Sequence, residues 1–238
     1  MNNKFQTRSD EKEFLDLLGI PKELLFRNLH ELDVLNRRLG GHFISLQGIK
    51  KLVTDKNKTY HIADLGCGSG DTMKYIANWA RSAGYKVKLT GVDMNADAIE
   101  YLHGHCSNYK EIKGIISDYH HFLRITQNID ILHCSLFCHH LNDIELTELL
   151  RWANLNTETG FVINDLQRNW LAYYSAWSFT RIFNGSLLAK NDGPISVLRG
   201  FKLSELENIL TIAGIEKYSI KRKPGFRYLI VGKTMVRR

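Results

Sequence analysis

Residues 60–71, YHIADLGCGSGD, constrain the fold most, because they place three glycines at alternate positions directly after a short apolar run. The apolar run has the character of a β-strand, and the residues after Gly70 suit the first turn of a helix. Glycine lets the backbone turn tightly and approach a ligand closely, since it has no Cβ atom. The free N–H groups of a helix start favour the negative end of that ligand. The stretch therefore predicts a strand, a glycine loop and a helix that cradle a nucleotide-type cofactor.

The spacing of these glycines argues against two common phosphate-binding loops. The dinucleotide fingerprint G-x-G-x-x-G requires a third glycine where Asp71 or Met73 stands, depending on the glycine from which the count starts. A phosphate loop of the G-x-x-x-x-G-K-[ST] type requires a lysine that is absent at that spacing. The pattern that remains is D-x-G-x-G-x-G, beginning at Asp64. A carboxylate beside the loop repels a pyrophosphate but attracts a cationic amino group.

This pattern resembles the first motif of the class I S-adenosylmethionine-dependent methyltransferases, and the resemblance extends over roughly residues 58–234. It implies S-adenosylmethionine as cofactor and S-adenosylhomocysteine as product. It also implies an α/β fold: a Rossmann-like, doubly wound, seven-stranded sheet that finishes in an antiparallel C-terminal hairpin. The cofactor-binding residues that the resemblance implies are Asp64, Gly66, Cys67, Gly68, Gly70, Asp71, Asp93, Met94, Asp118, Tyr119 and Ser135.

Two acids of this set have more specific expected roles. Asp93 ends the strand expected over residues 86–94, where a carboxylate can accept hydrogen bonds from both ribose hydroxyls. Asp118 follows the strand expected at 110–117, and in the family an acid here bonds the adenine amino group while its neighbour packs on the ring. The alternative for Asp118 is a helix cap for the segment HHFLRI.

The rest of the chain alternates between strands and helices, which predicts a parallel sheet with helices on both faces. Residues 1–57 are expected to form an N-terminal helical cap or lid, with helical character over 11–53, and residues 58–238 the methyltransferase domain. Residues 168–200 form an expected helical insertion over the substrate, in which NDGPISVLRGF (191–201) is expected to be a loop. Within the insertion, the aromatic residues expected to contact a flat substrate are Trp170, Tyr173, Tyr174 and Trp177. Simple packing of these rings onto the domain is the alternative.

The residues after the fourth strand indicate the class of substrate. Enzymes that methylate nucleobase or glutamine nitrogens usually carry an acid or asparagine, two prolines and an aromatic residue here, whereas this chain has CSLFCHH. The stretch LFCHHLND instead resembles small-molecule enzymes, including quinone-biosynthesis and natural-product O-methyltransferases. That resemblance implies His139 or His140 as a base that takes a hydroxyl proton, oriented by Asp165, with Arg168 holding a substrate oxygen. A purely structural role is the alternative for either histidine.

No metal site is expected, because the cluster of Cys134, Cys138, His139 and His140 lacks the paired spacing of zinc ligands. The net charge of +7 is concentrated toward the C-terminus, where no acid follows Lys217. Such a stretch can attract an acidic carrier protein, a nucleic acid or an anionic substrate, or can be a solvated edge. The four cysteines and the absence of a signal peptide or a long apolar run favour a cytoplasmic protein without a membrane span.

The sequence therefore predicts a methyltransferase that acts on a small molecule, most plausibly at a hydroxyl of a phenolic, quinone-like or polyketide-type compound. An RNA methyltransferase and a non-catalytic cofactor-binding regulator are the alternatives. Nucleic acid is disfavoured as a partner, and the sequence leaves the oligomeric state open.

Overall fold

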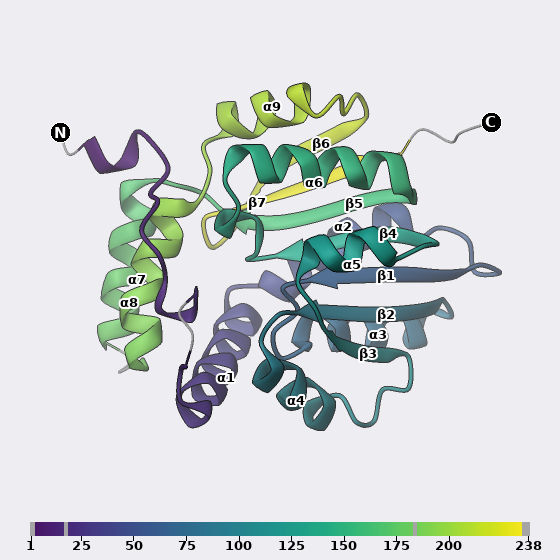
Figure 1. Cartoon of the computed structure of the whole chain (residues 1–238), viewed down its shortest axis with the longest axis horizontal. Coiled ribbons are helices and arrows are strands. Elements are labelled where there is room, and N and C mark those ends of the chain that lie inside the picture. Colours follow the sequence, from purple (N-terminus) through teal and green to yellow (C-terminus); the bar gives the residue numbers. More distant parts are fainter. Residues whose placement is uncertain (1–2, 17–18, 183–184, 235–238) are drawn as a thin grey trace.

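The protein is built around one seven-stranded sheet with the strand order β3-β2-β1-β4-β5-β7-β6 (Figure 1). The computed structural model describes residues 3–16, 19–182 and 185–234. Strand β7 runs antiparallel to both of its neighbours, and the other pairs are parallel. The strands are β1 (Thr59–Leu65), β2 (Lys86–Asp93), β3 (Ile112–Ile116), β4 (Ile129–Ser135), β5 (Thr157–Leu166), β6 (Tyr218–Lys223) and β7 (Arg227–Lys233). The expected Rossmann-like sheet with its antiparallel hairpin is confirmed.

Helices cover both faces of the sheet, because alternate residues of the central strands point to opposite sides. In β1, Ile62 packs with the helices α2 (Gly41–Leu52), α3 (Asp71–Ala83) and α4 (Ala96–His105). Ala63 and Leu65 pack on the other side, with α5 (Tyr119–Ile125), α6 (Asp143–Asn156) and α9 (Leu203–Ile212). Helix α2 belongs to the first of these layers, so only part of the expected N-terminal cap stands apart from the sheet. Within the described residues, no helix combines the length and apolar character needed to cross a bilayer.

The strand order reverses between β1 and β4: β2 and β3 lie on one side of β1, and β4 and β5 on the other. This creates a crevice at the carboxyl ends of β1 and β4. In β1, Asp64 lies between Gly91 of β2 and His133 of β4, close to this end of the sheet. Helices α7 (Trp170–Ile182) and α8 (Leu187–Arg199) stand beside the same end, with α1 (Lys22–Arg38) below them (Figure 1). The fold thus brings the glycine loop, the turn after β4 and the insertion to one end of the molecule.

The loop expected over residues 191–201 was wrong, because α8 continues to Arg199 through Pro194. Proline inside a helix removes one backbone hydrogen bond, which normally favours a break. Here Pro194, Ile195, Val197 and Leu198 are all buried, and this burial outweighs the lost hydrogen bond. Tertiary packing therefore decides the conformation of this segment against its local preference.

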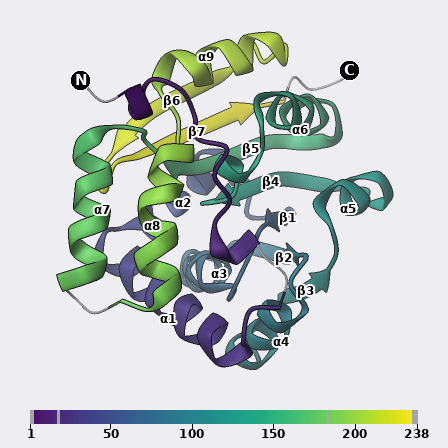
Figure 2. The same cartoon turned by 60° about the vertical axis from the view of Figure 1, so that its left-hand side comes forward.

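The N-terminal residues also differ from the expected helical run over 11–20, of which residues 17 and 18 lie outside the described residues. Only two 3-10 turns form, Asn3–Phe5 (η1) and Phe14–Asp16 (η2), and the rest of residues 3–16 is irregular. We call residues 3–16 the N-terminal segment; Figure 2 shows it descending beside α8 toward the centre of the molecule. Its amides bond α8 instead of forming a helix, since Asp192 accepts hydrogen bonds from the N–H groups of Phe14 and Leu15.

Arg199 is the main side-chain anchor of the N-terminal segment. It donates to Asp16 at 2.6 Å and to the carbonyl oxygen of Glu11 at 3.2 Å. It also donates to the carbonyl oxygens of His139 and His140 at 3.2 and 3.0 Å, and so joins the segment to the turn after β4.

We expect Arg199→Ala to lower the free energy of unfolding by about 1–3 kcal/mol, because buried acceptors lose a charged donor. Limited trypsin digestion should then cut faster after Lys12, which mass spectrometry detects as a fragment beginning at Glu13. Arg222→Ala, on an exposed position of β6, is the matched control and should change neither property. Equal protection of the N-terminal segment in the Arg199 variant and the control would contradict this role.

Candidate active site

The glycine loop has a backbone that other residues could not adopt without strain. Gly66, Gly68 and Gly70 have φ angles of 65°, 48° and 78°, in the left-handed region. A Cβ atom on Gly66 would lie 2.5 Å from the ring of Phe137, which packs against the loop. The loop is fixed to β2, because the N–H of Gly68 donates to Asp93 Oδ2 at 3.0 Å. These constraints explain why the sequence places glycines at these positions.

A cavity of about 110 Å³ opens beside the loop. Six of the residues expected to bind the cofactor line this cavity: Asp64, Gly66, Cys67, Gly68, Asp71 and Ser135. The walls of this cavity are formed by glycine backbone and by several carboxylates. They suit the amino-acid end of S-adenosylmethionine, because an acid can bind its ammonium group. The other expected cofactor residues, Gly70, Asp93, Met94, Asp118 and Tyr119, lie outside the lining of this cavity.

Helix α1 supplies a wall of the cofactor cavity that the sequence analysis missed. Its contributing residues follow helical spacing and are Leu29, Leu32, Asp33 and Asn36. Asp33 is buried and lies 3.1 Å from Nε2 of His42, whose Nδ1 is 2.9 Å from the hydroxyl of Thr72. Asp33 and Asn36 lie beside the leucine stripe at helical spacing. Polar residues next to an apolar stripe were the sequence signal that could have identified this wall.

The acids at the cavity already have protein partners. Asp64 is buried, and its Oδ1 lies 2.6 Å from Nδ1 of His133. Asp71 Oδ1 lies 2.6 Å from Nε2 of His105, and Ser69 donates its hydroxyl to Asp71 Oδ2. The other oxygen of Asp64, Oδ2, has no donor among the described residues and suits a cofactor ammonium group.

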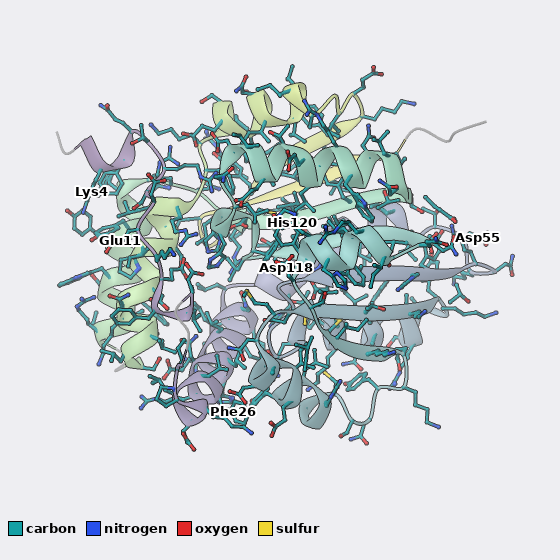
Figure 3. All side chains as sticks on the ribbon, in the orientation of Figure 1. Lys4, Glu11, Phe26, Asp55, Asp118 and His120 are labelled. Carbon is teal, nitrogen blue, oxygen red and sulfur yellow. The ribbon has the colours of Figure 1, made fainter. Side chains whose placement is uncertain are left out.

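The residues expected at the ribose and adenine follow β2 and β3. Burial raises the pKa of Asp93, and hydrogen bonds from the amides of Asn95 and Gly68 partly offset this effect. Asp118 caps α5, since its Oδ1 accepts the N–H groups of His120 and His121, which is the alternative raised above for this residue. Figure 3 shows Asp118 and His120 together at the start of α5. Met94 is 71% exposed, so it presents an apolar surface at the end of β2.

Tyr119 packs edge-on against Phe137 with ring centroids 5.5 Å apart, and its hydroxyl is buried without a hydrogen-bond partner among the described residues. Burial raises the pKa of this hydroxyl well above its ordinary value. Glu145, Glu148 and Cys138 contribute to this shift, so the hydroxyl lies toward α6, and Tyr119 lines neither cavity.

His139 and Asp165 form a close buried pair. Nδ1 of His139 lies 2.7 Å from Asp165 Oδ1, and the backbone N–H of His139 donates to Asp165 Oδ2 at 3.2 Å. Burial alone would lower the pKa of His139, but Asp165 and Glu13 outweigh it and raise the pKa to about 9. The resemblance implied either His139 or His140 as the partner of Asp165; the fold places His139 beside Asp165 and His140 beside Asp16.

Glu13 of the N-terminal segment is a third member of this cluster, and the sequence analysis did not identify it. The carboxylate is 3% exposed, and its Oε1 lies 3.4 Å from Nε2 of His139. Ser196 of α8 donates its hydroxyl to the same oxygen at 2.8 Å. His140 is also engaged, with Nδ1 3.0 Å from Asp16 and Nε2 3.9 Å from Glu13. No local pattern links Glu13 to residues so distant in the sequence, so only the fold reveals it.

A second, larger cavity of about 740 Å³ lies along the N-terminal segment and the turn after β4. Its walls include Asp16, His139, His140 and Arg199, together with Arg8 of the N-terminal segment. Arg8 donates to the carbonyl oxygens of His139 and Leu141, at 3.1 and 2.7 Å. Two histidines that the sequence singled out therefore face a cavity large enough for a metabolite.

The substrate contact expected for Arg168 is not supported. This side chain is buried, and its guanidinium donates to the carbonyl oxygens of Phe5, Gln6 and Gly200 and to the carboxylate of Glu205. Its donors are directed at protein acceptors, so its role here is to fix the start of the N-terminal segment to α9.

The aromatic residues expected to enclose the substrate lie on α7, and none of them lines either cavity. Trp170, Tyr174 and Trp177 are 62%, 46% and 43% exposed. Tyr173 contacts Phe5, Tyr174 and the ammonium group of Lys4, which lies 3.7 Å from its ring (Figure 3 labels Lys4). Helix α8 takes the position nearest the site, because its buried face contacts η2 and the turn after β4.

Comparison with known proteins agrees with the geometry. A family model described as a methyltransferase domain matches residues 56–200, more than half of the chain. A search of curated proteins finds no match. Among solved structures, the plantazolicin methyltransferase BpumL in complex with SAH has a TM-score of 0.64 at 18% identity, covering 90% of this chain and 95% of that one.

Two further structures share the fold. The magnesium protoporphyrin IX methyltransferase ChlM from Synechocystis PCC 6803, with bound SAH, has a TM-score of 0.55 at 14% identity and covers 82% of this chain and 84% of that one. The pyocyanin biosynthetic protein PhzM has a TM-score of 0.53 at 16% identity, covering 81% and 55%. The glycine loop, the strand order and these similarities agree, and the chain belongs to the methyltransferase domain family, as a class I enzyme whose cofactor is S-adenosylmethionine.

Proposed function

We propose that the protein transfers a methyl group from S-adenosylmethionine to a hydroxyl of a small phenolic, quinone-like or polyketide-type compound. The observation that carries the proposal is the His139–Asp165 pair, 2.7 Å apart, in the turn directly after the strand whose end lines the cofactor cavity. A hydroxyl acceptor needs a group that removes its proton, and an imidazole oriented by a carboxylate suits this task in its neutral form. The raised pKa of His139, about 9, makes this form predominant only at alkaline pH.

The cofactor supplies a sulfonium-bound methyl group, which moves to the acceptor oxygen as the carbon–sulfur bond breaks. The protein then contributes mainly alignment and activation of the acceptor. Asp165 fixes the ring orientation of His139 through Nδ1, so that Nε2 and the adjacent His140 mark the place where the hydroxyl is activated. Glu13 faces the same Nε2, so the N-terminal segment takes part in forming this site.

Similarity to enzymes of small-molecule metabolism supports this class of substrate. BpumL has been captured with a triazolic desmethylPZN analog and SAH, and ChlM is a methyltransferase of magnesium protoporphyrin IX. The basic residues Lys221, Arg222 and Lys223 on β6 are compatible with an acidic carrier protein that presents the substrate. The four cysteines are unpaired, which is compatible with the cytoplasmic location that we propose. Neither RNA methylation nor a non-catalytic role has a specific observation in its favour.

Turnover of a panel of phenols and hydroxyquinones with S-adenosylmethionine tests the proposal, with S-adenosylhomocysteine formation as the readout. We expect Asp165→Asn to lower kcat about 10²–10⁴-fold, because His139 loses the carboxylate that orients it. Asp55→Asn is the matched control and should keep full activity, since Asp55 lies near the amino end of β1, far from the site (Figure 3). Unchanged kcat in Asp165→Asn would rule out activation at this pair, and absence of turnover with every hydroxyl acceptor would contradict the substrate class.

Cofactor binding can be measured without knowing the acceptor. We expect Asp93→Asn to weaken S-adenosylhomocysteine binding about 10–100-fold in calorimetry, because a charged hydrogen bond contributes about 1.5–3 kcal/mol and each ~1.4 kcal/mol is tenfold in affinity. The same substitution at Asp55 should leave the affinity unchanged. An affinity within about twofold of wild type in Asp93→Asn would show that this carboxylate does not bind the ribose.

A further inference from the structure

Three side chains that can coordinate a metal ion come from two distant parts of the chain and meet at the end of the sheet. One ligand atom each from Glu13, His139 and His140 lies within 4.8 Å of the others. Nε2 of His139 is 3.4 Å from Glu13 Oε1, and Nε2 of His140 is 3.9 Å from Glu13 Oε2. The two imidazole rings are 4.3 Å apart, so both present the same nitrogen to one carboxylate.

The remaining nitrogen of each ring has a carboxylate partner of its own. Nδ1 of His139 lies 2.7 Å from Asp165, and Nδ1 of His140 lies 3.0 Å from Asp16. A carboxylate accepts hydrogen bonds, so each Nδ1 carries a proton, and in the neutral ring the lone pair is then on Nε2. Each Nε2 therefore faces an oxygen of Glu13, at 3.4 Å for His139 and 3.9 Å for His140, in a position where a metal ion can replace the hydrogen-bonding proton. Histidine ligands of metals almost always have such a carboxylate or carbonyl partner at the other nitrogen.

The spacing is close to that of a coordination site. Donor atoms about 2.1 Å from a tetrahedral ion lie roughly 3.4 Å from one another, which matches the 3.4 Å between His139 and Glu13. The 3.9 Å between His140 and Glu13 and the 4.8 Å span of the group are longer, so the side chains must close inward on the ion. Within the described part of the chain, the ion pairs of Glu13 are with these two histidines, whereas Asp16 also pairs with Arg199. We propose that Glu13, His139 and His140 bind one divalent transition-metal ion of the Zn²⁺ type, with Asp16 and Asp165 orienting the two histidines.

This site differs from the cysteine–histidine cluster for which the sequence analysis expected no metal. Cys134 and Cys138 are buried within the apolar core between the sheet and α6, and they are not part of the converging group. Glu13, which the N-terminal segment contributes, replaces them as the third ligand.

The role of the ion rests on the proposed function. Three protein ligands leave one position of a tetrahedral ion open, and a hydroxyl bound there has a lowered pKa. A metal at this position would therefore activate the acceptor hydroxyl at the place assigned to the His139–Asp165 pair. It would also explain why the N-terminal segment is held so closely by α8.

Metal binding to the full chain tests the proposal directly. After dialysis against a chelator, Zn²⁺ titration should give one site per chain, and Co²⁺ should give visible d–d bands without thiolate charge-transfer absorption. We expect Glu13→Gln and His140→Gln to weaken Zn²⁺ binding at least ~100-fold. Asp16→Asn, which changes the partner of His140 Nδ1 and the acceptor of Arg199, should weaken it about 10–100-fold. His120→Gln, at an exposed position on α5, is the matched control and should bind like wild type. Circular dichroism confirms that each variant is folded.

Three results would overturn the proposal: no Zn²⁺ or Co²⁺ bound, thiolate absorption in the Co²⁺ spectrum, or unchanged affinity in folded Glu13→Gln. The first would show that the two histidines and Glu13 pair directly with one another, with no ion between them. Because the readout is metal binding, the outcome is separate from that of the turnover assay. A protein that methylates hydroxyls without binding metal would refute only the metal site, and one that binds metal but methylates no hydroxyl would refute only the proposed function.

Discussion

Buried carboxylates at the carboxyl ends of three strands determine how this end of the molecule is organised. Asp64 ends its strand 2.6 Å from His133, Asp93 accepts the N–H of Gly68, and Asp165 lies 2.7 Å from His139. A buried charge without partners costs several kcal/mol, so each acid requires a donor close to it. The partners that satisfy these acids are in the glycine loop, the neighbouring strand and the turn after β4. The need to pair these carboxylates with donors therefore sets the positions of the site residues.

A chain of polar contacts extends from Asp64 through the core to helix α1. It runs through Asp64, His133, Ser45, Asn164, Arg227 and Asn36, of which the last lines the cofactor cavity. Burial lowers the pKa of Arg227 to about 10, a measure of how far this guanidinium is removed from water. Because a buried polar chain is stable only when every member is satisfied, it holds the α1 wall in one position relative to β1. The cofactor cavity is therefore coupled to the core of the sheet.

The N-terminal segment is the least expected part of the structure. Its acids and Arg8 make few contacts with one another and many with α8 and the turn after β4. Charged hydrogen bonds of this kind give a segment without regular structure a defined position. The same contacts place two carboxylates against the histidines, so the first residues of the chain contribute to the site from which they are most distant in sequence.

The sequence by itself determined the sheet, the glycine loop and the placing of polar residues at the strand ends, while the resemblance left His139 and His140 as alternative partners of Asp165. Those features depend on local patterns: alternating apolar residues, glycines at positive φ, and polar residues at strand ends that a parallel sheet always brings together. Only the tertiary structure decided that residues 191–199 continue a helix, that the donors of Arg168 bind protein acceptors, and that α8 rather than α7 faces the site. It also decided that Asp33 lines the cofactor cavity and that Glu13 lies against His139. These outcomes depend on contacts between residues far apart in the chain, whose free energy outweighs the local preferences that a sequence displays.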